Sequence, residues 1–426
     1  MRSQGFGWAV AVLAAALAGC GSMGDEARAQ EGAVATSAPP QPREPHADRQ
    51  ARALAFSEWQ AGFRTRALGE GIRPEIFDSV MTGVTPSSRV RELDGAQPEF
   101  VRPVWQYLDS AVSETRVANG RSAYSRLRPT LTAIEERYGT DAQIVTAVWG
   151  LETAYGSVRG DFPVAQSLAT LAHDGRRRDW AERELIGAMR IVQDGDVRAG
   201  SLVGSWAGAM GHTQFMPTSY HRFAQDFDGD GQRNIWSEDP TDALASTAHY
   251  LAENGWTPGQ PWGIEVRLPD SFDWLLSDRS QTHPASFWTQ AGVTTFDGGQ
   301  LPDHGPARLL APVGAGGPAF LTYENFEVIK TYNNSTSYAL AIGLLGDRIE
   351  GRTGVRATWP RDRLPLSRSD SRELQERLTA MGYDTQGADG RIGPNTERAI
   401  RQFQVDRGLT PDGTATDRLL ALVRQG

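Results

Sequence analysis

The chain has 426 residues but a single cysteine, Cys20, so it cannot form an internal disulfide. It also lacks a basic excess: its formal net charge is −9, which disfavours nucleic acid as the main partner. Its seven histidines do not follow metal-ligand spacing, which argues against a histidine-ligated zinc site. What is present, 39% hydrophobic and 22% charged residues, is typical of a globular protein with roughly two or three domains.

The N-terminal segment has the features of an exported protein. A basic start is followed by the apolar run Trp8–Leu17, which is too short to span a bilayer. Leu17-Ala18-Gly19-Cys20 then resembles the lipobox of bacterial lipoproteins, in which the cysteine is acylated; an ordinary signal peptide with an incidental cysteine is the alternative. We therefore predict a lipoprotein signal peptide over 1–19, lipidation at Cys20 and a periplasmic location. Because Gly21 and not Asp follows, the resemblance favours the outer membrane.

The rest of the chain divides by composition. Residues 20–50 are rich in Ala, Gly and Pro and predict a flexible tether. Helical periodicity dominates from 51 to about 256, with helices expected over 121–138, 142–155, 180–193 and 241–254. Short apolar runs at 263–268, 308–312 and 320–323 predict strands, and helical pattern returns at 337–350.

The last part of the chain predicts a separate small module. After a linker over 353–366, three apolar helix faces occur within 367–426. Two Asp-Gly turns, Asp389-Gly390 and Asp412-Gly413, each precede a helix and give a weak internal repeat. The expected fold is therefore mainly α, with a small mixed α+β subdomain and a C-terminal three-helix module.

Glu152 is the candidate catalytic residue. On a helix over 142–155 it lies about 80° from Ile144, close to Val145 and Val148 on the apolar side. Lost hydration disfavours the charged carboxylate, so its pKa should rise towards that of a general acid. The alternative is a buried glutamate paired with an arginine for structural reasons.

Asp226-Phe227-Asp228-Gly229-Asp230-Gly231-Gln232 matches the first half of a calcium loop, with oxygen ligands at positions 1, 3 and 5 and a carbonyl at 7. Ser237 replaces the closing glutamate at position 12, and Glu238, Asp239 or Asp242 could complete the shell. We expect a structural calcium ion; a solvated Asp-rich turn is the alternative.

Two further segments have the composition of a ligand site. Residues 204–220 place three glycines and several small or polar residues around Ser205 and Gln214, which suits either a close ligand or tight packing. Residues 332–338 supply hydroxyls, amides and rings that suit carbohydrate, although Ser335–Ser337 also fit a helix N-cap.

Taken together and in order, residues 147–156, 204–220, 226–231 and 332–338 resemble the lytic murein transglycosylase B family over about Ala51 to Arg352. The terminal module, with Leu374-Gln375, 389–393 and 399–404, is similar to a peptidoglycan-binding domain. The resemblance implies a lysozyme-like helical domain over 51–352, with Glu152 as catalytic acid.

The resemblance also implies ligand residues. The implied calcium ligands are Asp226, Asp228, Asp230, the Gln232 carbonyl and Asp242. The implied saccharide contacts are Tyr107, Arg176, Arg177, Ser205, Gln214, Tyr250, Tyr332, Asn333 and Tyr338.

The expected reaction uses one acid. Glu152 would protonate the bond between N-acetylmuramic acid and N-acetylglucosamine, then accept the proton of the sugar's own C6 hydroxyl as a 1,6-anhydro end forms; no catalytic cofactor is needed. The alternatives are a hydrolytic muramidase with a second carboxylate, for example Asp161, and a non-catalytic scaffold. The expected partners are glycan strands of peptidoglycan and a lipid anchor, with cell-wall synthesis or division proteins as further candidates that the sequence does not identify.

Overall fold

The computed structural model describes residues 46–95, 102–174 and 176–426. The predicted signal peptide, Cys20 and most of the predicted tether lie outside the described residues. The first helix, α1, spans His46–Gly69, so residues 46–50 are helical and the tether prediction is wrong for them. Within these described ranges, no helix is both long and apolar enough to cross a membrane.

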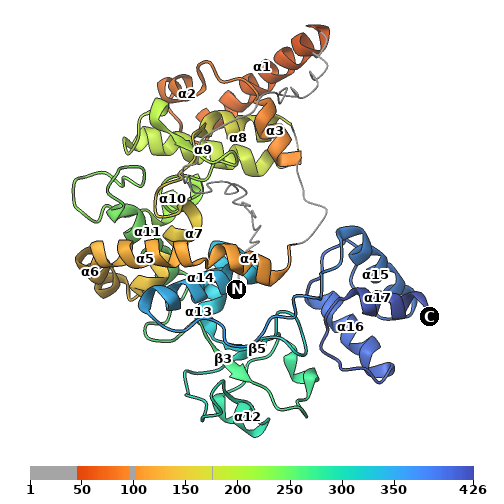
Figure 1. The fold of residues 1–426 in the computed structure, drawn as a ribbon. Helices are drawn as coiled ribbons and strands as arrows, with labels where there is room; N and C mark the ends of the chain where they lie inside the picture. Colours follow the sequence, from red (N-terminus) through yellow and green to blue (C-terminus); the bar gives the residue numbers. More distant parts are fainter. Residues whose placement is uncertain (1–45, 96–101, 175) are drawn as a thin grey trace, which may run out of the picture.

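One helical lobe lies at the top of Figure 1 and has its own apolar core, which includes Phe63, Phe77, Leu168 and Leu185. Amphipathic spacing places these side chains on the inward faces of their helices. The helices of this lobe are α1, α2 (Pro74–Met81), α3 (Ser88–Gly95), α8 (Val164–His173), α9 (Arg178–Asp194) and α10 (Pro217–Phe223).

The second helical lobe surrounds α7, which spans Ala142–Thr153. Its core joins Ile144 and Val148 of α7 to Leu340 and Leu345 of α14. Its other members are α4 (Val104–Ala111), α5 (Glu114–Arg126), α6 (Arg128–Tyr138), α11 (Thr241–Glu253), α13 (Glu324–Tyr332) and α14 (Thr336–Glu350).

The predicted helix over 121–138 is wrong as a single element. The chain breaks at Leu127, which caps both α5 and α6 with φ −98° and ψ 15°. Pro129 lies in the first turn of α6. Because proline has no amide hydrogen and disfavours helical backbone before it, a new helix starts here.

The predicted strands form a small antiparallel sheet, drawn below the two helical lobes in Figure 1. The strand order is β4-β3-β6-β5, and Ile264 pairs with Leu321 in the β3–β6 register. Its elements are β3 (Gly263–Arg267), η2 (Trp274–Ser277), α12 (Ala285–Gln290), β4 (Thr294–Thr295), β5 (Arg308–Leu310) and β6 (Ala319–Thr322). A second pair, β1 (Phe162–Pro163) and β2 (Val203–Gly204), adjoins the short helix η1 (Ala199–Ser201).

The C-terminal module lies at one side of the molecule (Figure 1) and consists of α15 (Arg368–Ala380), α16 (Pro394–Asp406) and α17 (Asp417–Arg424). Its core is formed by the three predicted apolar faces. The internal repeat is visible in its hydrogen bonds. Gln375 accepts from the Gly390 amide and donates to Asp389, while Gln404 accepts from the Gly413 amide and donates to Asp412.

Candidate active site

Glu152 lies in the last turn of α7, which ends at Thr153. The sequence predicted that Glu152 would lie on the single apolar face of this helix, and that prediction is wrong. The helix has no single apolar side, because every residue from Ala142 to Gly150 is buried. Leu151 and Glu152 are the two partly exposed residues of this helix. The glutamate is therefore presented at the open end of a helix that is otherwise enclosed by protein.

The carboxyl of Glu152 has the protonation behaviour expected of a general acid. Burial of the carboxyl raises its pKa to about 7, and a hydrogen bond from the Tyr338 hydroxyl partly opposes that rise. The Tyr338 hydroxyl donates to Oε1 at 2.7 Å. The partner is a hydroxyl and not a guanidinium, so the alternative of a structural Glu–Arg pair does not describe this residue.

Three tyrosines that are distant in sequence converge on this carboxyl. Burial raises the pKa of Tyr107 to about 12, and the charge of Glu152 adds to the rise. Burial and the same charge hold the pKa values of Tyr332 and Tyr338 well above the ordinary value. All three hydroxyls therefore remain protonated at neutral pH and can donate hydrogen bonds. They come from α4, α13 and α14, which the fold brings around the end of α7.

The end of α7 is fixed to the glycine-rich segment by His212, which sequence reasoning missed. The Trp149 indole donates to His212 Nδ1 at 3.1 Å, and His212 Nε2 lies 2.7 Å from the Ser237 carbonyl, which assigns the proton to Nε2. The Thr153 hydroxyl donates to the His212 carbonyl at 2.6 Å. These bonds tie the residues on both sides of Glu152 to one loop.

Gly150, two residues before Glu152, leaves room for the ring of Tyr155. The ring of Tyr155 packs so closely on the helix that a Cβ at position 150 would lie 2.5 Å from it. The chain turns there through Ala154 and Tyr155, both with positive φ. A strained turn directly after Glu152 is the kind of backbone that occurs where a side chain must be placed accurately.

Ser205 and Gln214 both stabilise the glycine-rich segment. Ser205 Oγ accepts from the Ala209 amide at 3.0 Å, which leaves its hydroxyl hydrogen available. Gln214 has φ 56°, and its side-chain amide donates to the carbonyls of Arg159 and Gly211. Their role as saccharide contacts stays a prediction.

Tyr250 and Asn333 lie beside Tyr332. The Tyr250 ring packs against that of Tyr332 with centroids 4.9 Å apart, and its hydroxyl donates to the Thr331 carbonyl. Tyr332 in turn donates to the Thr213 carbonyl at 2.6 Å. Asn333 is partly exposed at the C-terminal end of α13. The last sequence motif and the glycine-rich segment thus meet at one place.

Arg176 and Arg177 lie in the other helical lobe. Arg176 donates to Asp94 Oδ2 at 2.7 Å, and Arg177 contacts the other oxygen of the same carboxylate. Together with Arg91 and Leu171 they line a pocket of about 260 Å³. Among the described residues, no hydrogen bond or ion pair joins this pocket to Glu152.

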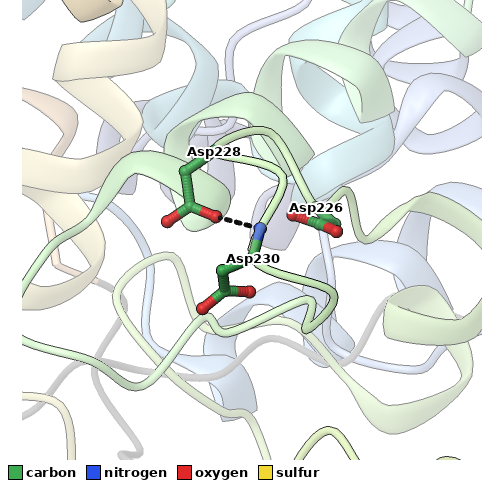
Figure 2. A group of neighbouring side chains, drawn as sticks. All are labelled: Asp226, Asp228 and Asp230. Carbon is green, nitrogen blue, oxygen red and sulfur yellow. Dashed lines mark hydrogen bonds between the residues drawn. The ribbon is translucent and has the colours of Figure 1, made fainter.

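The loop that follows α10 brings Asp226, Asp228 and Asp230 together (Figure 2), with one carboxylate oxygen of each within 4.8 Å of the others. Asp226 accepts from the Gly229 and Gly231 amides, and Asp228 accepts from the Asp230 amide. Three preorganised carboxylates at loop positions 1, 3 and 5 fit a hard divalent cation such as calcium.

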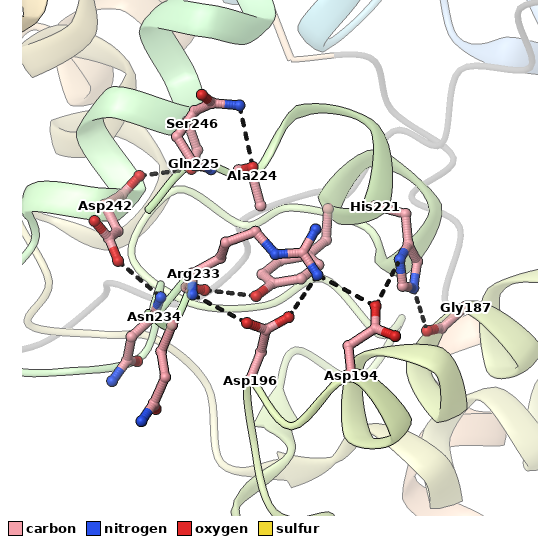
Figure 3. Close-up of polar contacts among 12 residues, drawn as sticks. Gly187, Asp194, Asp196, His221, Ala224, Gln225, Arg233, Asn234, Asp242 and Ser246 are labelled. Atoms are coloured by element: carbon pink, nitrogen blue, oxygen red, sulfur yellow. Dashed lines mark hydrogen bonds and ion pairs between the residues drawn. The ribbon is translucent and has the colours of Figure 1, made fainter. Parts of the chain in front are cut away.

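Asp242 does not join that cluster. Its Oδ2 accepts from the Asn234 amide at 2.8 Å (Figure 3). Its Oδ1 accepts from the Phe227 amide, also at 2.8 Å, so the carboxylate links Phe227 to Asn234. Its role as a calcium ligand, and that of the Gln232 carbonyl, stay predictions.

Arg233, within the loop over 226–242, anchors the loop to the first helical lobe (Figure 3). Arg233 donates to Asp196 at 2.6 Å and to Asp194 at 3.2 Å, while its carbonyl accepts from the Tyr220 hydroxyl. His221 lies 3.8 Å from Asp194. The loop therefore connects the two lobes through hydrogen bonds, because Arg233 contacts the first lobe and Asp242 belongs to α11 of the second.

The site can donate a proton to a ligand and accept one from it at the Glu152 carboxyl. Glu152 supplies the acid, and the surrounding tyrosines supply neutral hydrogen-bond donors in a largely dry environment. Asp161, the candidate second carboxylate, is exposed in the loop before β1. This suits a reaction in which one carboxyl acts first as acid and then as base.

Comparison with known proteins agrees with this geometry. Residues 55–347 match the family described as Transglycosylase SLT domain, and residues 367–423 match a peptidoglycan binding domain family. The chain is 32% identical over 299 residues to the membrane-bound lytic murein transglycosylase B of Escherichia coli, covering 68% of this chain and 79% of that protein.

Solved structures show the same relationship. SltB3 from Pseudomonas aeruginosa in complex with NAG-anhNAM-pentapeptide is 47% identical, with a TM-score of 0.84 over 87% of this chain and 99% of that one. The lytic transglycosylase Slt35 from Escherichia coli in complex with calcium is 29% identical, with a TM-score of 0.59 over 68% of this chain and 92% of that one. The chain therefore belongs to the transglycosylase SLT domain family, in its lytic murein transglycosylase branch, as the motifs around Glu152 predicted.

Proposed function

We propose that this protein is a lytic transglycosylase that cleaves the β-1,4 bond between N-acetylmuramic acid and N-acetylglucosamine in peptidoglycan and leaves 1,6-anhydro ends. The observation that carries the proposal is the Glu152 carboxyl. Its pKa is about 7 and its hydrogen-bond partner is the Tyr338 hydroxyl, 186 residues away in sequence. The family membership and the complex of SltB3 with an anhydro muropeptide support it.

In the proposed reaction, protonated Glu152 gives its proton to the glycosidic oxygen as the C1–O bond breaks. The sugar becomes oxocarbenium-like, or forms an oxazolinium ion with its own 2-acetamido group. The Glu152 carboxylate then takes the proton of the C6 hydroxyl as that oxygen bonds to C1. Because the nucleophile belongs to the same sugar, the closure has a high effective molarity and no second carboxylate is required.

The surrounding residues bind and orient the sugars. Tyr107 offers a protonated hydroxyl near the carboxyl. The hydroxyls of Tyr338 and Tyr332 already donate to Glu152 and to the Thr213 carbonyl, so towards a sugar their oxygens act as hydrogen-bond acceptors. Further contacts come from the side chains proposed as saccharide ligands, which are Ser205, Gln214, Tyr250, Asn333, Arg176 and Arg177. For the two arginines this requires a glycan or peptide that extends to the pocket beside Asp94.

Calcium in the loop over 226–242 is proposed as a structural ion. Asp226, Asp228 and Asp230 would bind it, and the Gln232 carbonyl and Asp242 are proposed to complete the shell. The charge of the ion offsets the repulsion among three carboxylates. The calcium complex of Slt35 supports this assignment for the family.

The proposed organisation is a signal peptide over 1–19, a lipid anchor on Cys20, a tether, the transglycosylase domain over 51–352, a linker over 353–366 and a peptidoglycan-binding module over 367–426. The anchor would hold the enzyme in the periplasm at the outer membrane. The name of the Escherichia coli relative, which is membrane-bound, supports membrane attachment.

The test is mass spectrometry of purified sacculi incubated with the full chain. Wild type should release anhydro muropeptides, and Glu152→Gln should abolish the release while still binding sacculi. Asp161→Asn, which removes an exposed carboxylate, is the matched control and should keep wild-type activity. Reducing-end muramic acid products that depend on Asp161 would favour the hydrolase, and near-wild-type release by Glu152→Gln would exclude the proposed acid.

A further inference from the structure

The turn that follows Glu152, over 153–160, has a backbone that must be held in place by other segments. Glu152 lies one residue before the end of α7, where helical hydrogen bonding is incomplete and helices fray. Ala154 and Tyr155 follow with φ 49° and 60°. Such left-handed backbone costs free energy and persists only where the surrounding structure enforces it. The position of the Glu152 carboxyl therefore depends on the contacts made by this turn.

His212 contacts the start of this turn and the helix end before it. Trp149 and Thr153 are four residues apart, so they lie on one face of α7, next to Glu152. Trp149 donates to the His212 ring at 3.1 Å and Thr153 to its carbonyl at 2.6 Å. The ring also packs on Gly156, where a Cβ would lie 2.6 Å from it. Burial lowers the pKa of His212, so the ring stays neutral at pH 7 and can accept the indole hydrogen.

Arg159, near the other end of the turn, makes a second connection. Its guanidinium donates to the carbonyls of Trp236 and Ser237, each at 2.8 Å, and pairs with Glu238 at 2.5 Å. The Glu238 side chain is 93% exposed, so this ion pair contributes little, and the two charge-assisted bonds to carbonyls are the stronger contacts. The Arg159 carbonyl in turn accepts from the Gln214 side chain at 3.1 Å.

Both connections end on the Ser237 carbonyl. His212 Nε2 lies 2.7 Å from this oxygen and Arg159 Nη1 lies 2.8 Å from it, and its two lone pairs can accept both bonds. The 3.3 Å between Nη1 and Nε2 is then the separation of two donors that share one acceptor. Ser237 is itself fixed, because its amide donates to Asn234 Oδ1 at 3.0 Å. This carbonyl is therefore a fixed anchor, 85 residues away in sequence from Glu152.

We propose that His212 and Arg159 are positioning residues for the reaction, which hold the turn after Glu152 by binding the Ser237 carbonyl together. This rests on the proposed function, because it takes Glu152 as the acid. The acid must face the glycosidic oxygen first and the C6 hydroxyl next, and a displacement of about 1 Å can lower the rate about a hundredfold. The tyrosines around the carboxyl come from α4, α13 and α14, so loss of either connection lowers kcat and leaves KM nearly unchanged.

The test measures kcat and KM of the full chain on soluble, uncross-linked peptidoglycan strands, together with the NMR signal of the Trp149 indole N–H, assigned as the signal lost in Trp149→Phe. His212→Leu removes both ring bonds and should lower kcat about a hundredfold and shift the indole signal upfield. His212→Asn keeps an acceptor close to the place of Nδ1, so it should keep the indole signal and recover about tenfold of that loss. Arg159→Ala should lower kcat about tenfold. His221→Asn is the matched control, because His221 also bonds a carbonyl, that of Gly187 at 2.8 Å, and it should keep wild-type kcat.

Three results would overturn the proposal: wild-type kcat in the His212 and Arg159 variants, an equal loss of kcat in His221→Asn, or a loss that appears in KM alone. If His212→Leu does not fold, His212→Asn and Arg159→Ala still decide the matter, because each leaves one of the two connections in place. The proposed function is judged separately by the products of wild type and of Glu152→Gln. If wild type releases anhydro muropeptides while the His212 and Arg159 variants keep full kcat, the positioning proposal alone is wrong.

Discussion

Replacing Tyr338 by phenylalanine should move the pH dependence of the enzyme in a defined direction. The Tyr338 hydroxyl donates to Glu152 Oε1 at 2.7 Å and favours the charged carboxylate, so this bond lowers a pKa that burial raises to about 7. Removing the hydroxyl leaves burial unopposed. The pKa of Glu152 should therefore rise further, and the acid should stay protonated to higher pH.

The size of the rise in the pKa of Glu152 follows from the strength of the hydrogen bond that Tyr338 donates to it. A hydrogen bond to a charged group contributes about 1.5–3 kcal/mol, and partial exposure of Glu152 reduces this by roughly half. Since one pKa unit corresponds to about 1.36 kcal/mol, the expected rise is about one unit. Activity that requires protonated Glu152 should thus decline near pH 7 in wild type and near pH 8 in Tyr338→Phe.

The assay is the initial rate of anhydro muropeptide release from sacculi between pH 5 and pH 9, with kcat/KM taken at each pH. Tyr138→Phe is the matched control, because Tyr138 donates to Gln225 at 3.1 Å and its loss should leave the profile unchanged. A descending limb that stays in place, or moves to lower pH, would refute the electrostatic account of Glu152.

Three further predictions concern stability. Glu152 has a folded pKa above its unfolded value, so its contribution to stability is present below about pH 4.5 and is lost as the pH rises through about 7. Glu152→Gln should accordingly be more stable than wild type at pH 8, by about 1–3 kcal/mol, and not at pH 4; equal differences at both pH values in thermal melts would contradict this. Asp228→Asn should weaken calcium binding at least about tenfold by calorimetry and remove most of the calcium-induced rise in melting temperature, whereas a variant of exposed Asp161 should do neither. Gln375→Ala should destabilise the C-terminal module by about 2 kcal/mol in denaturant unfolding, because this buried side chain bonds Asp389, Arg391, Thr396 and the Gly390 amide; a loss below 0.5 kcal/mol would show that the repeat is not stabilised this way.

The amino-acid sequence by itself determined the features that depend on neighbouring residues. Periodicity predicted α9, α11 and α14 almost to their ends, and turn chemistry predicted the loop that gathers Asp226, Asp228 and Asp230. The pattern around position 152 predicted the candidate acid, Glu152. These succeed because helix periodicity, strand alternation and Asp-Gly turns are set by residues a few positions apart.

Only the tertiary structure decided what surrounds those features. Tyr338 reaches Glu152 across 186 residues, His212 links α7 to the glycine-rich segment, and Asp242 bonds loop amides, separate from the three-aspartate cluster. Such contacts depend on how whole helices pack, which no local pattern records. For the same reason the loss of water around the Glu152 carboxyl was expected from one apolar helix face, whereas α7 is buried on all its faces from Ala142 to Gly150 and Glu152 is partly exposed at its end.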